Sequence, residues 1–187
     1  MNSRFCFFIV VGMISCREAT RPSDSSSNHV VAKQFVDAFY SFDHDSLETI
    51  LSEAKTSQPN ILYYQKWAEC GHYRIVQRNP PVQKNDSVVL VPVTVKDDLM
   101  AALEINFNVT DTFHIVVREG TIRSVETSSN DPELYHQAKA WVQQNHPELV
   151  EKPCEGIWNG GPTPCECIQG YIKGFGDFVK AKKVSSK

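Results

Sequence analysis

The sequence has no large excess of charge of either sign. Nineteen basic and 22 acidic side chains leave a net charge of −3 over 187 residues, which removes the electrostatic basis of general nucleic-acid binding. The chain also has no phosphate-binding glycine loop, zinc-protease motif or nucleophile elbow. Nucleic acid is therefore excluded as a leading partner, and no motif names a reaction. The length and the apolar share of 41% indicate one globular domain with a short additional element.

A hydrophobic run long enough to span a bilayer is also missing. The apolar stretch at residues 5–14 is short and follows a cationic start, which is typical of a cleavable export signal. Met13-Ile14-Ser15-Cys16 then resembles the lipobox of bacterial lipoproteins, with Met13 where leucine is usual. The resemblance implies lipidation of Cys16 and a lipid anchor in the cell envelope. The alternative is ordinary cleavage nearer Ala19, which would give a secreted or periplasmic protein.

These features divide the chain into four segments. We predict an export signal at residues 1–16 and a flexible tether at residues 17–28, which are rich in Ser, Thr, Asp and Pro. The main domain is expected at residues 29–150, and a C-terminal extension at residues 151–187. The mature protein is therefore predicted to be exported.

Four cysteines follow the signal, at positions 70, 154, 165 and 167. An even number of cysteines in an exported chain favours disulfides. A bond between Cys165 and Cys167 would be strained, so each is expected to pair elsewhere, or one stays free. We predict the pair Cys154–Cys167, which closes a loop rich in glycine and proline, and leave the partners of Cys70 and Cys165 open. A zinc site is disfavoured because Cys-x-Cys lacks the usual spacing and no nearby histidine completes it.

Helical patterns open the domain. Apolar residues at helical spacing predict a helix over residues 28–42, and Asp45 with Glu48 resembles a capping box that begins a second helix. Residues 61–67 are rich in aromatic side chains and fit either a short helix or the entrance to a strand.

The pattern then alternates with a period of two, which predicts strands. Their ranges are residues 73–78, 88–96, 101–118 and 121–127. Pro132 begins a further helix that ends at His146-Pro147. Because helices precede a meander of strands, the fold class is α+β with an antiparallel sheet.

The C-terminal extension carries its own helical signal. Thr163-Pro164-Cys165-Glu166 is a capping box followed by an amphipathic stripe from Ile168 to Val179. We expect the stripe to pack on the domain core. The alternative is a helix on a membrane surface, since five lysines accompany it.

The order of elements, with residues 109–115 running into residues 119–122, resembles the SnoaL-like branch of the nuclear transport factor 2 (NTF2)-like superfamily. The resemblance covers about residues 30–146. It implies an NTF2-like cone, in which N-terminal helices pack on a curved antiparallel sheet around one pocket. It also implies that the outer face of the sheet is solvated or forms a homodimer. The superfamily includes isomerases, dehydratases, cyclases and binding modules without activity, so the fold alone names no function.

Asp111 stands out in the long predicted strand. The other odd-numbered residues from Leu103 to Val117 are apolar and share one face: Leu103, Ile105, Phe107, Val109, Phe113, Ile115 and Val117. A carboxyl group in this row is desolvated, which raises its pKa and favours the proton-donating form. The resemblance agrees, because ketosteroid isomerases carry an aspartic acid at the matching place. A bulge that turns Asp111 outward is the alternative. His114 and Glu104 lie on the even-numbered outer face, where we expect no metal site.

The other catalytic residues of ketosteroid isomerases have no counterpart in this sequence. Asp37 occupies the place of the partner tyrosine, and residues 55–60 contain no carboxylate base, so steroid-isomerase chemistry is not expected. His72 remains the second catalytic candidate, although a histidine beside a glycine is more often structural.

Two functions are compatible with these observations. The first is a binding module for a small apolar molecule, or for a protein partner, with no cofactor or metal. Its predicted pocket residues are Asp111, Tyr40, Tyr63, Tyr64, Trp67, Phe107 and Phe113. The second is a cofactor-free dehydratase, cyclase or isomerase that uses Asp111 with His72 or a pocket tyrosine.

Overall fold

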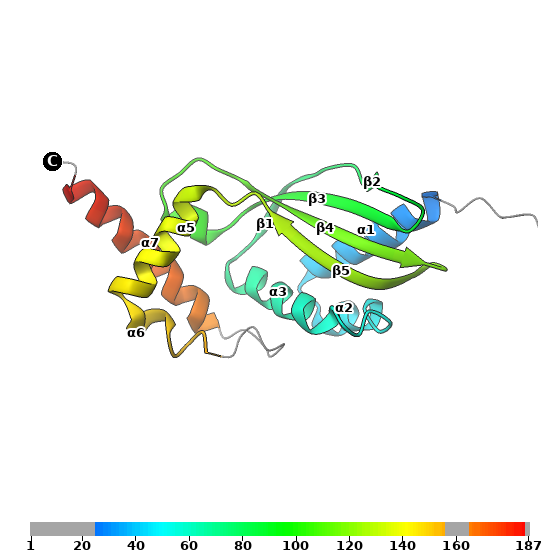
Figure 1. The fold of residues 1–187 in the computed structure, drawn as a ribbon, viewed down its shortest axis with the longest axis horizontal. Helices are drawn as coiled ribbons and strands as arrows, with labels where there is room; N and C mark the ends of the chain where they lie inside the picture. Colours follow the sequence, from blue (N-terminus) through cyan, green and yellow to red (C-terminus); the bar gives the residue numbers. More distant parts are fainter. Residues whose placement is uncertain (1–24, 156–164, 186–187) are drawn as a thin grey trace, which may run out of the picture.

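The computed structural model describes residues 25–155 and 165–185 (Figure 1). The predicted export signal, the lipobox and the capping box at Thr163 lie outside these residues. Helix α1, Ser25–Ser41, begins earlier than expected, so the last four residues of the predicted tether are helical. Three helices, a sheet and a C-terminal group of helices follow one another along the chain, which is an α+β arrangement.

The first three helices lie together below the sheet (Figure 1). Helix α1 packs against strands β3 and β4 through buried side chains at helical spacing, among them Phe35 and Phe39. Helix α2, His44–Ile50, is capped by Asp43, which accepts a hydrogen bond from the Ser46 amide. The predicted capping box at Asp45 is therefore wrong, because the carboxylate two residues earlier already occupies the cap position. Helix α3, Gln58–Cys70, settles the undecided aromatic segment as a helix.

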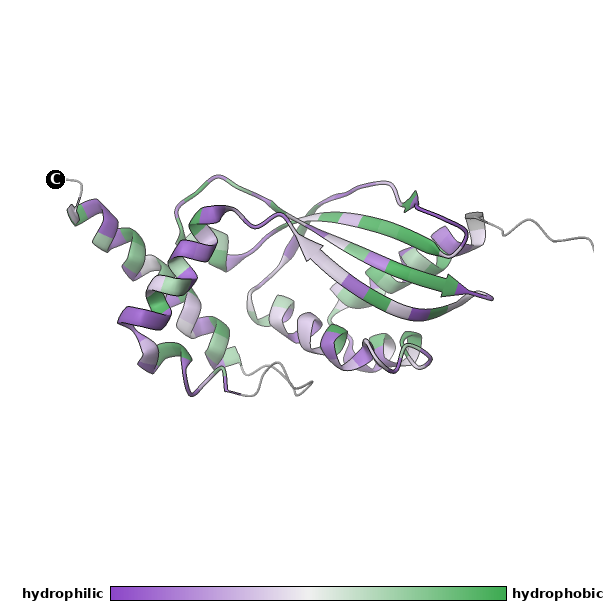
Figure 2. Cartoon of the chain, in the orientation of Figure 1, coloured by the Kyte–Doolittle hydropathy of each residue, from purple (hydrophilic) through white to green (hydrophobic). Residues whose placement is uncertain are grey.

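The sheet is antiparallel and curved, with five strands. The strands are β1 Arg74–Arg78, β2 Val82–Gln83, β3 Val88–Lys96, β4 Val109–Arg118 and β5 Thr121–Ser129. The order is β1-β3-β4-β5, and β2 also pairs with β3. Burial alternates along β3 and β4, and Figure 2 shows apolar and polar residues following one another along these strands. One face therefore packs on the helices and the other faces outward.

Strand β4 is shorter than the sequence predicts. Asp97 accepts a hydrogen bond from the Met100 amide at 2.8 Å and caps a short helix, α4, Asp98–Ala102. Glu104 then has a positive φ of 55°, and the strand begins only at Val109. The prediction of a strand from residue 101 is wrong, because the Asp97 cap favours a helical turn. Alternation holds only from Val109 onward.

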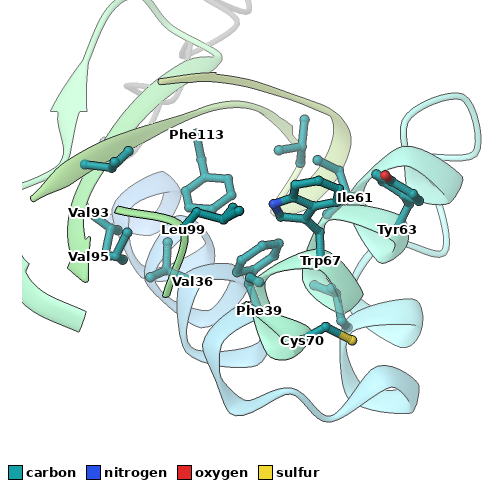
Figure 3. Packing of buried hydrophobic residues seen from close by; sticks show 14 of the residues in the cluster. Val36, Phe39, Ile61, Tyr63, Trp67, Cys70, Val93, Val95, Leu99 and Phe113 are labelled. Atoms are coloured by element: carbon teal, nitrogen blue, oxygen red, sulfur yellow. The ribbon is translucent and has the colours of Figure 1, made fainter. Parts of the chain in front are cut away.

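Large apolar side chains fill the space between the helices and the sheet. Figure 3 shows Phe113 on β4 pointing toward Phe39 on α1, with Trp67 of α3 beside them. The ring centroids of Phe39 and Phe113 lie 4.9 Å apart, and both side chains are fully buried. This core fixes α1 and α3 against the curved sheet.

Three helices form the C-terminal group at one end of the molecule (Figure 1). They are α5 Glu133–Asn145, α6 Pro147–Val150 and α7 Cys165–Ser185. Helix α7 contacts α3, α4, α5 and α6 and buries Ile168, Tyr171, Phe175 and Phe178. The prediction that its apolar stripe packs on the core is confirmed. Within the described residues, no helix combines the length and the apolar character needed to cross a membrane.

Two disulfides attach helix α7. Cys154 pairs with Cys167, the pairing expected from the sequence, and Cys70 at the end of α3 pairs with Cys165. Both bonds are compatible with an oxidising compartment. The second pair joins segments that are 95 residues apart, so it links the C-terminal group to the first half of the chain.

Candidate functional site

A cavity of about 850 Å³ lies between helix α3, strands β4 and β5 and the start of helix α5. Its aromatic wall residues are Tyr63, Tyr64, Trp67, Tyr73 and Tyr135. Its charged and polar residues include Asp111, Ser129, Asp131, His136 and Lys139. Polar side chains of β5 and of the segment before α3 line much of the rest. A concave site that combines apolar and polar groups is typical of small-molecule sites. We call this cavity the pocket.

Asp111 lies on the inner face of the sheet. It pairs with Val93 of β3 and Ser129 of β5, and only 2% of its surface is exposed. The register runs unshifted between β3 and β4 through this position, so the alternative of a bulge that turns Asp111 outward is wrong. The carboxyl group is thus held by a central strand at the wall of the pocket.

Hydroxyl groups surround the Asp111 carboxyl. The Tyr40 hydroxyl donates a hydrogen bond to Asp111 Oδ2 at 3.4 Å, and the hydroxyls of Tyr64 and Ser129 also favour its ionised form. Burial outweighs these donors and raises the pKa of Asp111 to about 6. The group is therefore charged at neutral pH and becomes neutral in mild acid.

A second buried acid lies behind the pocket. Asp97 is 4% exposed, and burial raises its pKa to about 6 although the Met100 and Leu99 amides oppose the shift. Its Oδ2 atom has no hydrogen-bond partner among the described residues. The charges of Asp97 and of Asp131 both raise the pKa of Asp111, so the acids repel one another across this region.

The tyrosines of the pocket stay protonated. Burial raises the pKa of Tyr64 and of Tyr73 well above the usual value near 10, and the Asp111 charge adds to both shifts. Burial likewise raises the pKa of Tyr135. These hydroxyls can donate hydrogen bonds to a bound molecule, but they do not serve as bases near neutral pH.

Lys139 of α5 lines the pocket together with a second basic side chain, His136. Burial lowers its pKa, and the charge of Asp131 opposes that effect. Its Nζ atom lies 5.8 Å from the centre of the Tyr171 ring. The ammonium group is therefore associated with helix α7 and Asp131 rather than with Asp111.

The structure brings only part of the predicted site together. Tyr63, Tyr64, Trp67 and Asp111 line the pocket. The remaining predicted residues do not line it: Tyr40 contacts Asp111, Phe113 is fully buried in the core, and Phe107 is partly buried against that core. Phe107 is misplaced because it precedes β4 and does not belong to the alternating strand.

His72 lies outside the pocket. Its Nδ1 atom lies 2.6 Å from Asp98 Oδ2, and 64% of its side chain is exposed. His114 Nε2 contacts the Ser128 hydroxyl at 3.0 Å on the outer face of the sheet. The predicted place of Glu104 on that face is wrong, because Glu104 precedes β4 and pairs with Lys183 of α7. No three potential metal ligands gather among the residues that the structure describes.

Among the pocket residues that the sequence does not predict are Tyr73, Tyr135, Asp131 and Lys139. Tyr135 and Lys139 are four residues apart in α5, so they share one helix face, and Asp131 shortly precedes that helix. The spacing indicates a shared face, but it does not indicate which side of the domain that face covers.

Comparison of the chain with protein-family models and with curated proteins gives no match. The function has to be argued from the pocket itself.

Proposed function

We propose that this protein is a small-molecule-binding module with an NTF2-like fold. The observation that carries the proposal is the buried carboxyl of Asp111 on the wall of a cavity of about 850 Å³. Ligand pockets of proteins are commonly apolar cavities of roughly 300–1,000 Å³ in which a few polar groups fix the orientation of the ligand. Asp111 and the nearby hydroxyls supply such groups, and the aromatic side chains supply the apolar surface.

The architecture supports the NTF2-like part of the proposal. Helices α1 and α3 pack on a curved antiparallel sheet, and α2 packs on these two helices, which agrees with the arrangement that the sequence resemblance implies. The proposal includes export of the chain with a lipid anchor at Cys16, and the two disulfides are compatible with an oxidising destination.

Acid–base catalysis is the second candidate, and one observation favours it. Asp111 and Tyr64 line the same pocket, and the tyrosine hydroxyl favours the ionised carboxyl. A carboxyl with a pKa of about 6 can take or give a proton near neutral pH. We prefer binding because the neighbouring tyrosines stay protonated and His72 lies elsewhere. Among the described residues, no hydrogen bond joins Asp111 to His136 or to Asp97, the other titratable candidates of this region.

Nile red, an uncharged fluorophore that brightens in apolar surroundings, tests the binding function. Ser129 lies opposite Asp111 on β5 and lines the pocket, so Ser129→Trp places an indole into the cavity. We expect saturable binding of one Nile red molecule to the wild type and at least a tenfold weaker affinity in this variant.

Thr112→Trp is the matched control. Thr112 follows Asp111 on β4, so its side chain lies on the opposite, outer face of the sheet and does not line the pocket. This variant should bind Nile red within twofold of the wild type. Equal affinity of the wild type and both variants would show that the fluorophore binds elsewhere, and no saturable binding by the wild type would refute the proposal.

A further inference from the structure

The Asp111 carboxylate has no cationic partner in the described part of the protein. Its neighbours within hydrogen-bonding range are hydroxyl groups, and none of the ion pairs of residues 25–155 and 165–185 includes it. Carboxylates are rarely this deeply buried unless they are paired with a positive group. Because Asp111 lines an open cavity, the missing positive group can reach it from the pocket.

Other acids strengthen the negative potential at this point. Asp131 lines the same pocket, and Asp97 lies behind it with one carboxyl oxygen that lacks a hydrogen-bond partner among the described residues. Both raise the pKa of Asp111, which means that each charge disfavours ionisation of the other. A cation in the pocket would relieve this repulsion.

Aromatic side chains form much of the remaining wall. Five of them line the pocket from α3, from the residue before β1 and from α5: Tyr63, Tyr64, Trp67, Tyr73 and Tyr135. Aromatic rings attract organic cations through their negative faces, and they also solvate apolar substituents. A ligand that is both cationic and apolar uses both properties of this wall.

We propose that the pocket binds a small organic cation, an amine or quaternary ammonium compound with apolar substituents, whose positive charge pairs with Asp111. This inference rests on the proposed binding function and specifies the class of ligand. An uncharged ligand leaves the buried carboxylate without a counter-ion. An anion meets Asp111 and Asp131 on the same wall, and Lys139 interacts with Asp131 on the α5 side.

Competition against Nile red at pH 8 tests the charge preference. The cationic probe is benzyltrimethylammonium, and the uncharged probe of similar shape is 2,2-dimethyl-1-phenylpropan-1-ol. We expect the cation to displace Nile red at a concentration at least tenfold lower than the alcohol. Asp111→Asn should remove this preference: the affinity for the cation should fall about tenfold, and the affinity for the alcohol should change little. Asp86→Asn removes an exposed charge outside the pocket and should change neither value.

The pH dependence of the wild type gives a second measurement. The affinity for the cation should rise as the pH increases from 5 to 7 and level off above, because ionised Asp111 attracts the ligand. The affinity for the alcohol should stay constant. The groups that face Asp111 from the surrounding elements are Tyr40, Tyr64, Tyr73, Asp97, Ser129 and Asp131. Glu126, His136 and Lys139 also line the pocket, so the pH dependence is assigned to Asp111 by its loss in Asp111→Asn. The tyrosines do not titrate in this range, whereas Asp97 titrates with Asp111 and acts in the same direction.

The outcomes separate this inference from the binding function. The cation proposal is overturned if cation and alcohol displace Nile red at equal concentrations. The binding function stays intact in that case as long as Ser129→Trp still weakens Nile red binding. Tighter binding of benzoate than of benzyltrimethylammonium also overturns the cation proposal and points to a basic side chain of the pocket, His136 or Lys139. Failure of Nile red to bind at all refutes the binding function on which the inference rests.

Discussion

The two halves of the molecule are held together by different means. Between the sheet and helices α1–α3, large side chains such as Phe35, Phe39 and Phe113 are fully buried against one another. In the C-terminal group, α7 lies so close to α5 and α6 that two of its glycines leave no room for a side chain, and two disulfides attach it. Both halves bury apolar side chains, but only the second adds helices in close approach and two covalent links. The pocket lies where these halves meet, so its walls depend on both.

Removal of a disulfide should have the largest effect and should act mainly on the C-terminal half. The bond Cys70–Cys165 closes a loop of 95 residues, so its replacement by alanines should cost about 4–5 kcal/mol on the chain-entropy model. Loss of Cys154–Cys167, which are 13 residues apart, should cost about 3 kcal/mol. Urea unfolding measures both values. Hydrogen exchange should show lost protection in α5 and α7 and retained protection in β3 and β4. Uniform loss over the chain would contradict the division into two halves.

One added methyl group at Gly170 should disrupt the close packing of α7 on α6. A Cβ atom at Gly170 would lie 2.1 Å from the carbonyl oxygen of Leu149, and this backbone cannot move without displacing α6. We expect Gly170→Ala to cost about 3 kcal/mol by overpacking. Gly176 is the matched control in the same helix, because a Cβ atom added there would meet no atom within 4 Å. There alanine should stabilise the helix by about 0.5–1 kcal/mol. Equal thermal stability of the two variants would refute the close packing of α7 on α6.

The sheet half should respond to pH through Asp111. Because its folded-state pKa is about 6, above the ordinary value near 4, this group favours folding in acid, and the benefit is lost as the pH rises from about 4 to 6. Asp111→Asn should therefore be more stable than the wild type at pH 8 by about 2 kcal/mol. The free energy of unfolding of the variant should also decline less than that of the wild type between pH 4 and 7. The decline that is left comes from Asp97. Urea titrations at several pH values measure this, with Asp86→Asn as control. A variant that is less stable at pH 8 would show that the hydroxyl contacts outweigh the burial cost.

Parts of this structure were readable from local patterns. The inward position of Asp111 follows from alternation along β4, because a period of two assigns each side chain to a face. The burial of α7 follows in the same way from its helical stripe. Helix α4 was not predicted, since Asp97 caps a turn inside a segment that also alternates. The alternation favours a strand in this segment and the Asp97 cap favours a helix, and the structure has the helix.

The pocket could not be assembled from the sequence. Tyr64, Tyr73 and Tyr135 come from three separate segments, and only the tertiary fold brings them to one cavity. The pairing of Cys70 with Cys165 could not be predicted either, because no local pattern links two residues that are 95 positions apart. Tertiary packing decides both features.

The bond between Cys70 and Cys165 ties the end of a pocket-lining helix to the start of α7. In a reducing environment the aromatic side chains of the pocket are still present, but the disulfide that fixes α3 relative to the C-terminal helices is lost. We therefore expect the proposed ligand binding to depend on oxidation of this bond, with weaker binding by the reduced polypeptide than by the oxidised one.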